Sequence, residues 1–414
     1  MRPRVSQKFL AAFFSRFPLY QIDRQMRLLK IKTKEGVVKY QIMGFQSDFH
    51  TCEANAAFAQ DSQPNPESFN NLQTNNHSTK PLLTSKLSLI GLTSRTIWCA
   101  LVLFACVSLG RAQGFVGFGG ATEYDSGFNP SVAISGTTVV EVHNGQAESG
   151  PMWYHVGQVY DSTTITWGPA YNYDTGFNPS VAISGTTVVE VHNGQGEFGP
   201  MWYHVGQVSG STIEWGPYYN YDTGWNPSVA ISGSTVVEVH NGQGGDGPMW
   251  YHVGTINGKK ITWGPSNSYD WGYNPSVALV GSTAFEVHNG QGGAGPLWYH
   301  VGTVGGNQIT WGPSNSYDWG WNPKIAAFAA NCYDDPPVVM EVHNANSYPG
   351  DLWYHYGDWP GGTTLALGPT TEYDWGWNPS IAADSDFNGV VEVHNGQGTF
   401  GPMWYHVGGN FCIG

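Results

Sequence analysis

From Tyr124 onward the chain alternates short apolar runs with clusters of turn-forming residues. In residues 173–217 the apolar runs are 180–183, 188–192, 201–208 and 212–215, separated by Ser-Gly, Asn-Gly-Gln-Gly and Ser-Gly-Ser segments. Short runs that alternate apolar with polar positions and end at Gly or Pro are typical of β-strands. No window has the period of a helix, so the pattern predicts four short strands in this unit.

The same unit is repeated in tandem at intervals of 48 or 49 residues, except for one interval of 56 residues. Tandem four-stranded units of this length are typical of propeller blades. The last unit ends before its fourth run, whereas an apolar segment, 115–119, precedes the first unit. We therefore predict an all-β, six-bladed β-propeller of four-stranded blades over residues 113–414. Segment 115–119 is expected to close the ring as an N-terminal strand that completes the last blade.

The region before the repeats has a different composition. Residues 1–112 carry 14 Lys and Arg against 6 Asp and Glu, and residues 54–80 are rich in Asn, Gln, Ser and Pro. Residues 1–85 are therefore expected to form a poorly structured extension, either genuine or the result of a mis-assigned start. Residues 86–112 contain an apolar run, 97–109, which predicts a signal peptide cleaved near Gln113 or a signal anchor. We therefore expect a secreted, extracellular protein, with cell-surface attachment as the alternative.

Charge and cysteine content limit the partners of the repeats. Residues 113–414 carry three basic residues against 25 acidic ones, so nucleic acid and anionic lipid surfaces are disfavoured. Cys332 and Cys412 would be the two cysteines of the mature protein, and an even pair in an exported domain is a candidate disulfide.

The strongest candidate for ligand binding is a YDxGxNP segment that opens every unit. An aromatic ring can pack on the C–H face of a sugar while carboxylate and amide oxygens accept hydroxyl protons. The alternative is a purely structural turn, because Asp can bond turn amides and Pro can set the entry into a strand. The candidate ligand-binding residues are Tyr124, Asp125, Phe128, Tyr173, Asp174, Phe177, Tyr221, Asp222, Trp225, Tyr269, Asp270, Tyr273, Tyr317, Asp318, Trp321, Tyr373, Asp374 and Trp377.

Each unit also contains an E-x-H segment followed by a W-x-H segment. In the second unit these supply Glu190, His192, Trp202 and His204. Glu and His together could bind a metal or exchange protons. Sixfold repetition argues against catalysis, which normally needs one asymmetric set of groups. A buried hydrogen-bond network is therefore the preferred interpretation.

The last unit contains a candidate calcium loop, Asp384, Asp386 and Asn388, followed by Gly389. Alternating oxygen ligands with a Gly at the sharp turn suit a hard cation. Asn-Gly closing a β-hairpin is the alternative. Beyond this calcium no cofactor is expected.

The chain contains no G-x-S-x-G, H-E-x-x-H or phosphate-binding Gly motif, and no Arg follows Arg111. We therefore predict no catalytic activity. Tandem units, Trp-rich strands and multiple equivalent sites resemble secreted lectin-like propellers of the fungal fucose-binding and tectonin types. The resemblance implies a monomeric, multivalent protein that binds glycans or glycoproteins at equivalent sites between blades, on the face of the YDxGxNP loops. The alternatives are a structural or protein-interaction propeller without a small ligand, and a glycoside hydrolase or lyase.

Overall fold

The computed structural model divides the chain into two units, Met1–Gly91 and Leu92–Gly414. It describes residues 30–34, 37–41, 117–145, 150–160, 163–194, 199–242, 247–290, 293–329, 336–345, 349–396 and 400–409. In the first unit, β1 (Lys30–Lys34) and β2 (Val37–Gln41) form an antiparallel pair. Within the described ranges no helix has the length and apolar character needed to span a bilayer.

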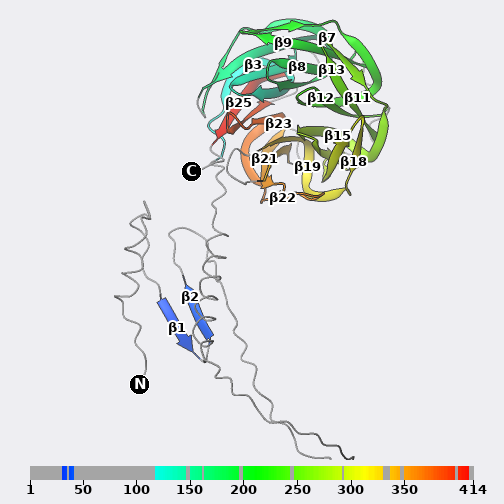
Figure 1. The fold of residues 1–414 in the computed structure, drawn as a ribbon. Helices are drawn as coiled ribbons and strands as arrows, with labels where there is room; N and C mark the ends of the chain where they lie inside the picture. The colour runs from blue at the N-terminus through cyan, green and yellow to red at the C-terminus, as the bar shows by residue number, and fades with distance from the viewer. Residues whose placement is uncertain are drawn as a thin grey trace, which may run out of the picture. The chain divides into compact units, whose positions relative to one another are not determined.

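The described part of the second unit is all-β, and its strands are arranged around a ring (Figure 1). Each repeat contributes a 14-residue strand, two strands of intermediate length and, in most repeats, a short fourth strand. The strands are β3 (Thr122–Ser135), β4 (Thr138–Asn144), β5 (Gly150–Val159), β6 (Ile165–Trp167), β7 (Tyr171–Ser184), β8 (Thr187–Asn193), β9 (Gly199–Ser209), β10 (Thr212–Trp215), β11 (Tyr219–Ser232), β12 (Thr235–Asn241), β13 (Gly247–Asn257), β14 (Lys260–Trp263), β15 (Asn267–Val280), β16 (Thr283–Asn289), β17 (Gly295–Gly305), β18 (Gln308–Trp311), β19 (Asn315–Phe328), β20 (Val338–Asn344), β21 (Gly350–Asp358), β22 (Ala366–Leu367), β23 (Thr371–Asp384), β24 (Gly389–Asn395) and β25 (Gly401–Gly409).

The predicted six-bladed propeller of separate four-stranded blades is wrong. The 23 described strands of this unit form one closed antiparallel barrel, in which 18 strands pair in an unbroken circuit and five short strands, β6, β10, β14, β18 and β22, flank it. The cause is the long strand of each repeat. In β11, residues 219–224 pair with β9 of the preceding repeat, and residues 225–232 pair with β12 of its own repeat. Hydrogen bonding therefore continues from one repeat into the next.

The segment predicted as a loop is thus the middle of a strand. The register of β11 against β12 shifts between Trp225 and Ser228, and Asn226 has a φ of 49° there. Asn tolerates this left-handed conformation better than most residues. Asn-Pro therefore bends the strand as a bulge, after which pairing resumes with a different neighbour.

Closure of the barrel also differs from the prediction. β25 pairs directly with β3, from Gly401 opposite Gly127 to Tyr405 opposite Thr122, as β5 pairs with β7 elsewhere in the circuit. Of the segment 115–119, the described part adds an isolated bridge between Phe118 and Gly408. The amide of Gly119 donates to the Val407 carbonyl at 2.9 Å. The N-terminal segment reinforces a barrel that β3 already closes.

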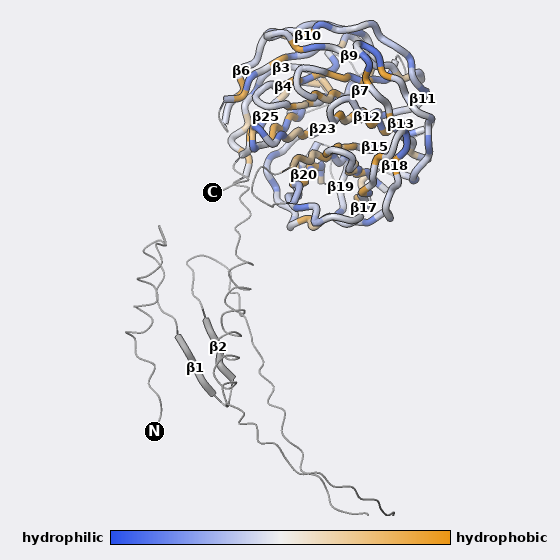
Figure 2. Tube along the Cα trace, viewed as in Figure 1, coloured by the Kyte–Doolittle hydropathy of each residue, from blue (hydrophilic) through white to orange (hydrophobic). Residues whose placement is uncertain are grey.

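The apolar core lies between neighbouring repeats rather than inside each repeat. Val391 and Val393 of β24, both fully buried, pack in one cluster with Val132 and Ile134 of β3. Figure 2 shows the corresponding apolar stretches along the inner strands, such as β12 and β23. Because every core cluster contains residues of adjacent repeats, the repeats stabilise one another.

Candidate functional site

In each YDxGxNP segment, the side chains of the Tyr, the Asp and the fifth-position aromatic lie in three different environments. The Tyr ring is partly buried and stacks on a Trp of the short strand, at 5.3 Å between the centroids of Tyr173 and Trp215. Its hydroxyl donates to Glu190 Oε1 at 3.0 Å. Burial raises the pKa of this phenol well above its ordinary value. The tyrosines therefore belong to the internal packing of the barrel.

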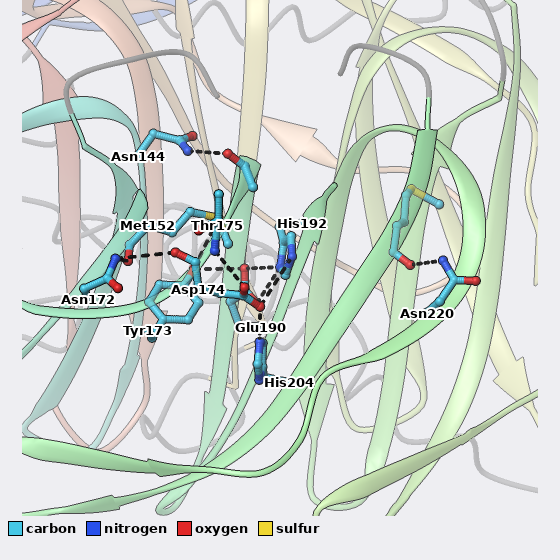
Figure 3. A network of polar contacts seen from close by, with 12 residues as sticks. Asn144, Met152, Asn172, Tyr173, Asp174, Thr175, Glu190, His192, His204 and Asn220 are labelled. Carbon is cyan, nitrogen blue, oxygen red and sulfur yellow. Dashed lines mark hydrogen bonds and ion pairs between the residues drawn. The ribbon is translucent and has the colours of Figure 1, made fainter. Parts of the chain in front are cut away.

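The Asp of the segment contacts two histidines. In the second repeat, Asp174 Oδ2 lies 2.7 Å from His204 Nε2 and 3.9 Å from His192 Nε2, and Oδ1 accepts the Thr175 amide at 2.7 Å. Figure 3 shows Asp174, Glu190, His192 and His204 converging. Burial opposes the charge on Asp174, but the bonds from His204 and the Thr175 amide outweigh it and lower the pKa of the carboxyl. Burial likewise opposes the charge on His204, but Asp174 raises its pKa.

The remaining ring nitrogens are held by acceptors. His192 Nδ1 lies 3.0 Å from Glu190 Oε2, and His204 Nδ1 lies 3.2 Å from the Gly216 carbonyl. Glu190 is fully buried. We call the Asp with its two His the aspartate–histidine cluster. Its copies are Asp125, His143 and His155; Asp174, His192 and His204; Asp222, His240 and His252; Asp270, His288 and His300; Asp318, His343 and His355; and Asp374, His394 and His406.

The Glu and the two His of the E-x-H and W-x-H segments therefore form a hydrogen-bond network. Residues i and i+2 of a strand point to the same face, so Glu190 reaches His192 directly. The Gly of the YDxG segment packs against a His of this network. A Cβ on Gly176 would lie 2.5 Å from His192 Cδ2 and 2.7 Å from the Asn193 carbonyl. Only Gly allows the strand to approach the imidazole this closely.

The fifth-position aromatics line a central cavity of about 350 Å³. Within the described ranges they are Phe128, Phe177, Trp225, Tyr273, Trp321 and Trp377. Some are in contact with each other, as in the pair Phe177 and Trp225, whose centroids are 5.0 Å apart. The structure thus gathers them at one cavity, apart from the Tyr and Asp of the same segments.

A belt of Asn side chains surrounds this cavity. Each of these Asn residues has a φ between 49° and 52°, and each lines the cavity wall. The side-chain amides donate to one another from repeat to repeat, for example from Asn322 Nδ2 to Asn378 Oδ1 at 3.0 Å. The other described links join Asn129 to Asn178, Asn178 to Asn226, Asn226 to Asn274, and Asn378 to Asn129.

Lys324 breaks the symmetry of the cavity. In other repeats a Ser at this position accepts a backbone amide of the next repeat, as Ser131 Oγ accepts Val181 N–H at 3.2 Å. The fifth repeat places Lys324 in the cavity wall instead. Withdrawal from water lowers the pKa of this ammonium group to about 8.

A further set of aromatics was missed by sequence reasoning. Trp271, Trp319 and Trp375 occupy the variable position of YDxG and are 52%, 56% and 41% exposed. Each follows a cluster Asp and donates its amide to that carboxylate, as Trp271 does to Asp270 Oδ1 at 2.8 Å. The sequence did contain a signal for them, namely the change at this position from Ser126, Thr175 and Thr223 in the first three repeats to Trp in the last three.

A second cavity shows how these positions border the cluster. It lies in the third repeat and is lined by Asp222, Thr223, His240, Gly242, Trp250 and Ser266. Thr223 is the counterpart of Trp271 in the next repeat. In the third repeat, Asp222 and His240 of the cluster and Thr223 at the variable position therefore line the same cavity.

The candidate calcium loop contains a side-chain-capped turn. Asp384 Oδ1 accepts the amides of Asp386 and Phe387 at 2.8 and 3.0 Å, and Asn388 has a φ of 53°. These contacts agree with the interpretation of the segment as an Asn-Gly hairpin. Calcium binding stays a prediction. Cys332 and Cys412 of the candidate disulfide lie outside the described residues.

No protein-family model matches the chain, and no curated protein matches its sequence. Among solved structures, a sialidase from Trypanosoma rangeli in complex with the inhibitor DANA is similar with a TM-score of 0.47 and 12% identity, over 69% of this chain and 55% of that one. The chain thus spans little more than half of that sialidase. A fucose-specific lectin from Aleuria aurantia is similar with a TM-score of 0.46 and 11% identity, over 70% of this chain and 96% of that one. Likenesses this distant assign no function to this chain.

The close approach of Gly176 to His192 yields a stability prediction. Gly176→Ala is expected to lower the free energy of unfolding by about 1–3 kcal/mol, because the new methyl must displace the imidazole or the strand. Gly150→Ala is the matched control, since a Cβ there meets nothing within 4 Å. Denaturant unfolding of both variants measures the difference. Equal stability of the two variants would contradict the packing role of Gly176.

Lys324 yields a pH prediction. The pKa of a Lys is about 10.4 in an unfolded chain and about 8 here, so folding is penalised below pH 8 and the penalty disappears as pH rises toward 10.4. Lys324→Ser, which restores the residue of the other repeats, is expected to be more stable than wild type by about 3 kcal/mol at pH 7. The gap should narrow between pH 8 and pH 10. Unfolding curves at several pH values measure it, and a gap independent of pH would refute the shift.

Proposed function

We propose that the protein binds carbohydrate through the exposed indoles of Trp271, Trp319 and Trp375. The observation that carries the proposal is their repetition at one position of successive repeats, each beside a cluster carboxylate. An exposed indole offers a flat apolar face for the C–H groups of a sugar ring. The adjoining Asp offers an oxygen that accepts sugar hydroxyl protons.

The charge of the repeats defines the class of glycan. With 25 acidic and three basic residues in 113–414, the surface repels sulfated or sialylated chains. Recognition of a carboxylate usually relies on Arg, and the repeats contain none. The proposed ligands are therefore neutral glycans of glycoproteins or polysaccharides. Weak sites on one barrel gain avidity when the glycan presents several copies of the sugar.

The binding test uses the full chain on an array of neutral and acidic glycans. Wild type is expected to bind a subset of neutral glycans, and the triple variant Trp271→Ala, Trp319→Ala, Trp375→Ala is expected to lose at least roughly a hundredfold in apparent affinity. The control Thr175→Ala, Thr223→Ala changes the same position in repeats without Trp and should bind as wild type does. Thr223→Trp should strengthen glycan binding, because it adds a further exposed indole on which a sugar ring can pack.

Other outcomes would contradict the proposal. Binding that survives the triple variant but is lost in Trp321→Ala would move the site to the central cavity. A folded wild type with no glycan ligand would favour a protein-interaction role. Release of free sugar from a bound glycan would favour a hydrolase.

We also propose that the protein is exported, because the run 97–109 has the length of a signal-peptide core and small residues follow it at Gly110 and Ala112. Expression of the full chain in a secretory host should yield extracellular protein that begins near Gln113. Edman sequencing or intact mass measures this end. Protein retained in the membrane with residues 86–112 intact would indicate a signal anchor instead.

A further inference from the structure

The aspartate–histidine clusters contain the donor set of a transition-metal site. In the fourth repeat, Asp270 Oδ2 lies 2.7 Å from His300 Nε2 and 3.7 Å from His288 Nε2. The ligand atoms of this cluster, and likewise those of the clusters of Asp318 and Asp374, all lie within 4.8 Å of one another. Two imidazole nitrogens and one carboxylate oxygen are ligands that zinc accepts, with a fourth position left for water.

The distances are compatible with one ion. Zinc binds His nitrogen and carboxylate oxygen at about 2.0–2.2 Å, which places tetrahedral donors about 3.3–3.5 Å apart. The two contacts of Asp270 lie on either side of this separation. A rotation of the partly exposed carboxylate would lengthen the 2.7 Å contact and shorten the 3.7 Å contact.

The surroundings already orient both imidazoles for a metal. His288 Nδ1 faces Glu286 Oε2 at 3.1 Å, and His300 Nδ1 faces the Gly312 carbonyl at 3.0 Å. Both acceptors hold the ring proton on Nδ1, so the Nε2 atoms can present lone pairs toward Asp270. Tyr269 in turn donates to Glu286 Oε1 at 3.0 Å, which fixes the carboxylate. A His ligand held by a carboxylate or carbonyl is the usual outer sphere of a zinc site.

The hydrogen bond between His300 and Asp270 does not conflict with metal binding. With Nδ1 donating to Gly312, the contact of 2.7 Å between Nε2 and Asp270 Oδ2 contains one proton shared between the two groups. A divalent ion would take the Nε2 lone pair and the Asp270 oxygen, and that proton would leave to solvent.

We propose that the clusters of Asp270, Asp318 and Asp374 bind divalent transition-metal ions of the zinc type, one per cluster. In the fifth repeat the Thr370 hydroxyl lies 3.0 Å from His355 Nε2 and also bonds Asp318, so it competes there with the ion.

The test measures metal bound to the full chain after dialysis against zinc and then against metal-free buffer. Wild type is expected to retain zinc, and the triple variant His288→Gln, His343→Gln, His394→Gln is expected to retain three equivalents fewer, one per cluster. Cobalt(II) in place of zinc should give the intense visible absorption of a four-coordinate ion. The control variant Trp271→Ala, Trp319→Ala, Trp375→Ala keeps every ligand and should retain as much zinc as wild type.

Two results would overturn the proposal: no zinc on wild type after dialysis, or equal zinc on wild type and the folded His variant. Should the His variant fail to fold, the cobalt spectrum of wild type decides, because an octahedral or absent signal excludes the site. The control also separates this proposal from carbohydrate binding, since loss of glycan binding with retained metal leaves the metal site intact.

Discussion

The 14-residue strand that belongs to two repeats is the constraint on which this structure depends. Its first half pairs with a strand of the preceding repeat, and its second half pairs with the next strand of its own repeat. The change of partner requires a bulge, and Asn226 at a φ of 49° provides it. The bend determines where the functional side chains point. Asp222 before it reaches the histidines, whereas Trp225 beside it faces the central cavity.

The local pattern predicted the shorter strands well. The run 188–192 corresponds to β8 (Thr187–Asn193), and the run 212–215 corresponds to β10 (Thr212–Trp215). The long strand β7 (Tyr171–Ser184) was predicted only from residue 180, because Gly, Asn and Pro at 176–179 are turn signals. Those residues do bend the chain, but pairing on both sides keeps it in the sheet. Local sequence does not encode which neighbour a strand pairs with, so separate blades could not be distinguished from a continuous circuit.

The candidate site was predictable to the extent that it is local. Alternation places Glu190 and His192 on one face, and the two are bonded. His204 and Asp174 are 30 residues apart, and their contact follows from the pairing of β8 with both β7 and β9, which no single-strand pattern reveals. The exposed indoles were missed for another reason. Position x of YDxG varies between repeats, so it did not belong to the recurring pattern from which the candidate residues were chosen, although Trp271 is exposed there.

Charge balance explains why the clusters are built from histidine. Residues 113–414 contain no Arg and only three Lys, so the buried Glu of each repeat has no permanent cation beside it. Each repeat instead contains two imidazoles against one buried Glu and one partly exposed Asp. An unpaired buried carboxylate is costly, and protons on these rings or a bound cation can offset its charge. His288 is 1% exposed and bonded to Glu286, so any positive charge must enter from the side of Asp270, where the cluster reaches solvent. The same opening that admits a proton can therefore admit an ion.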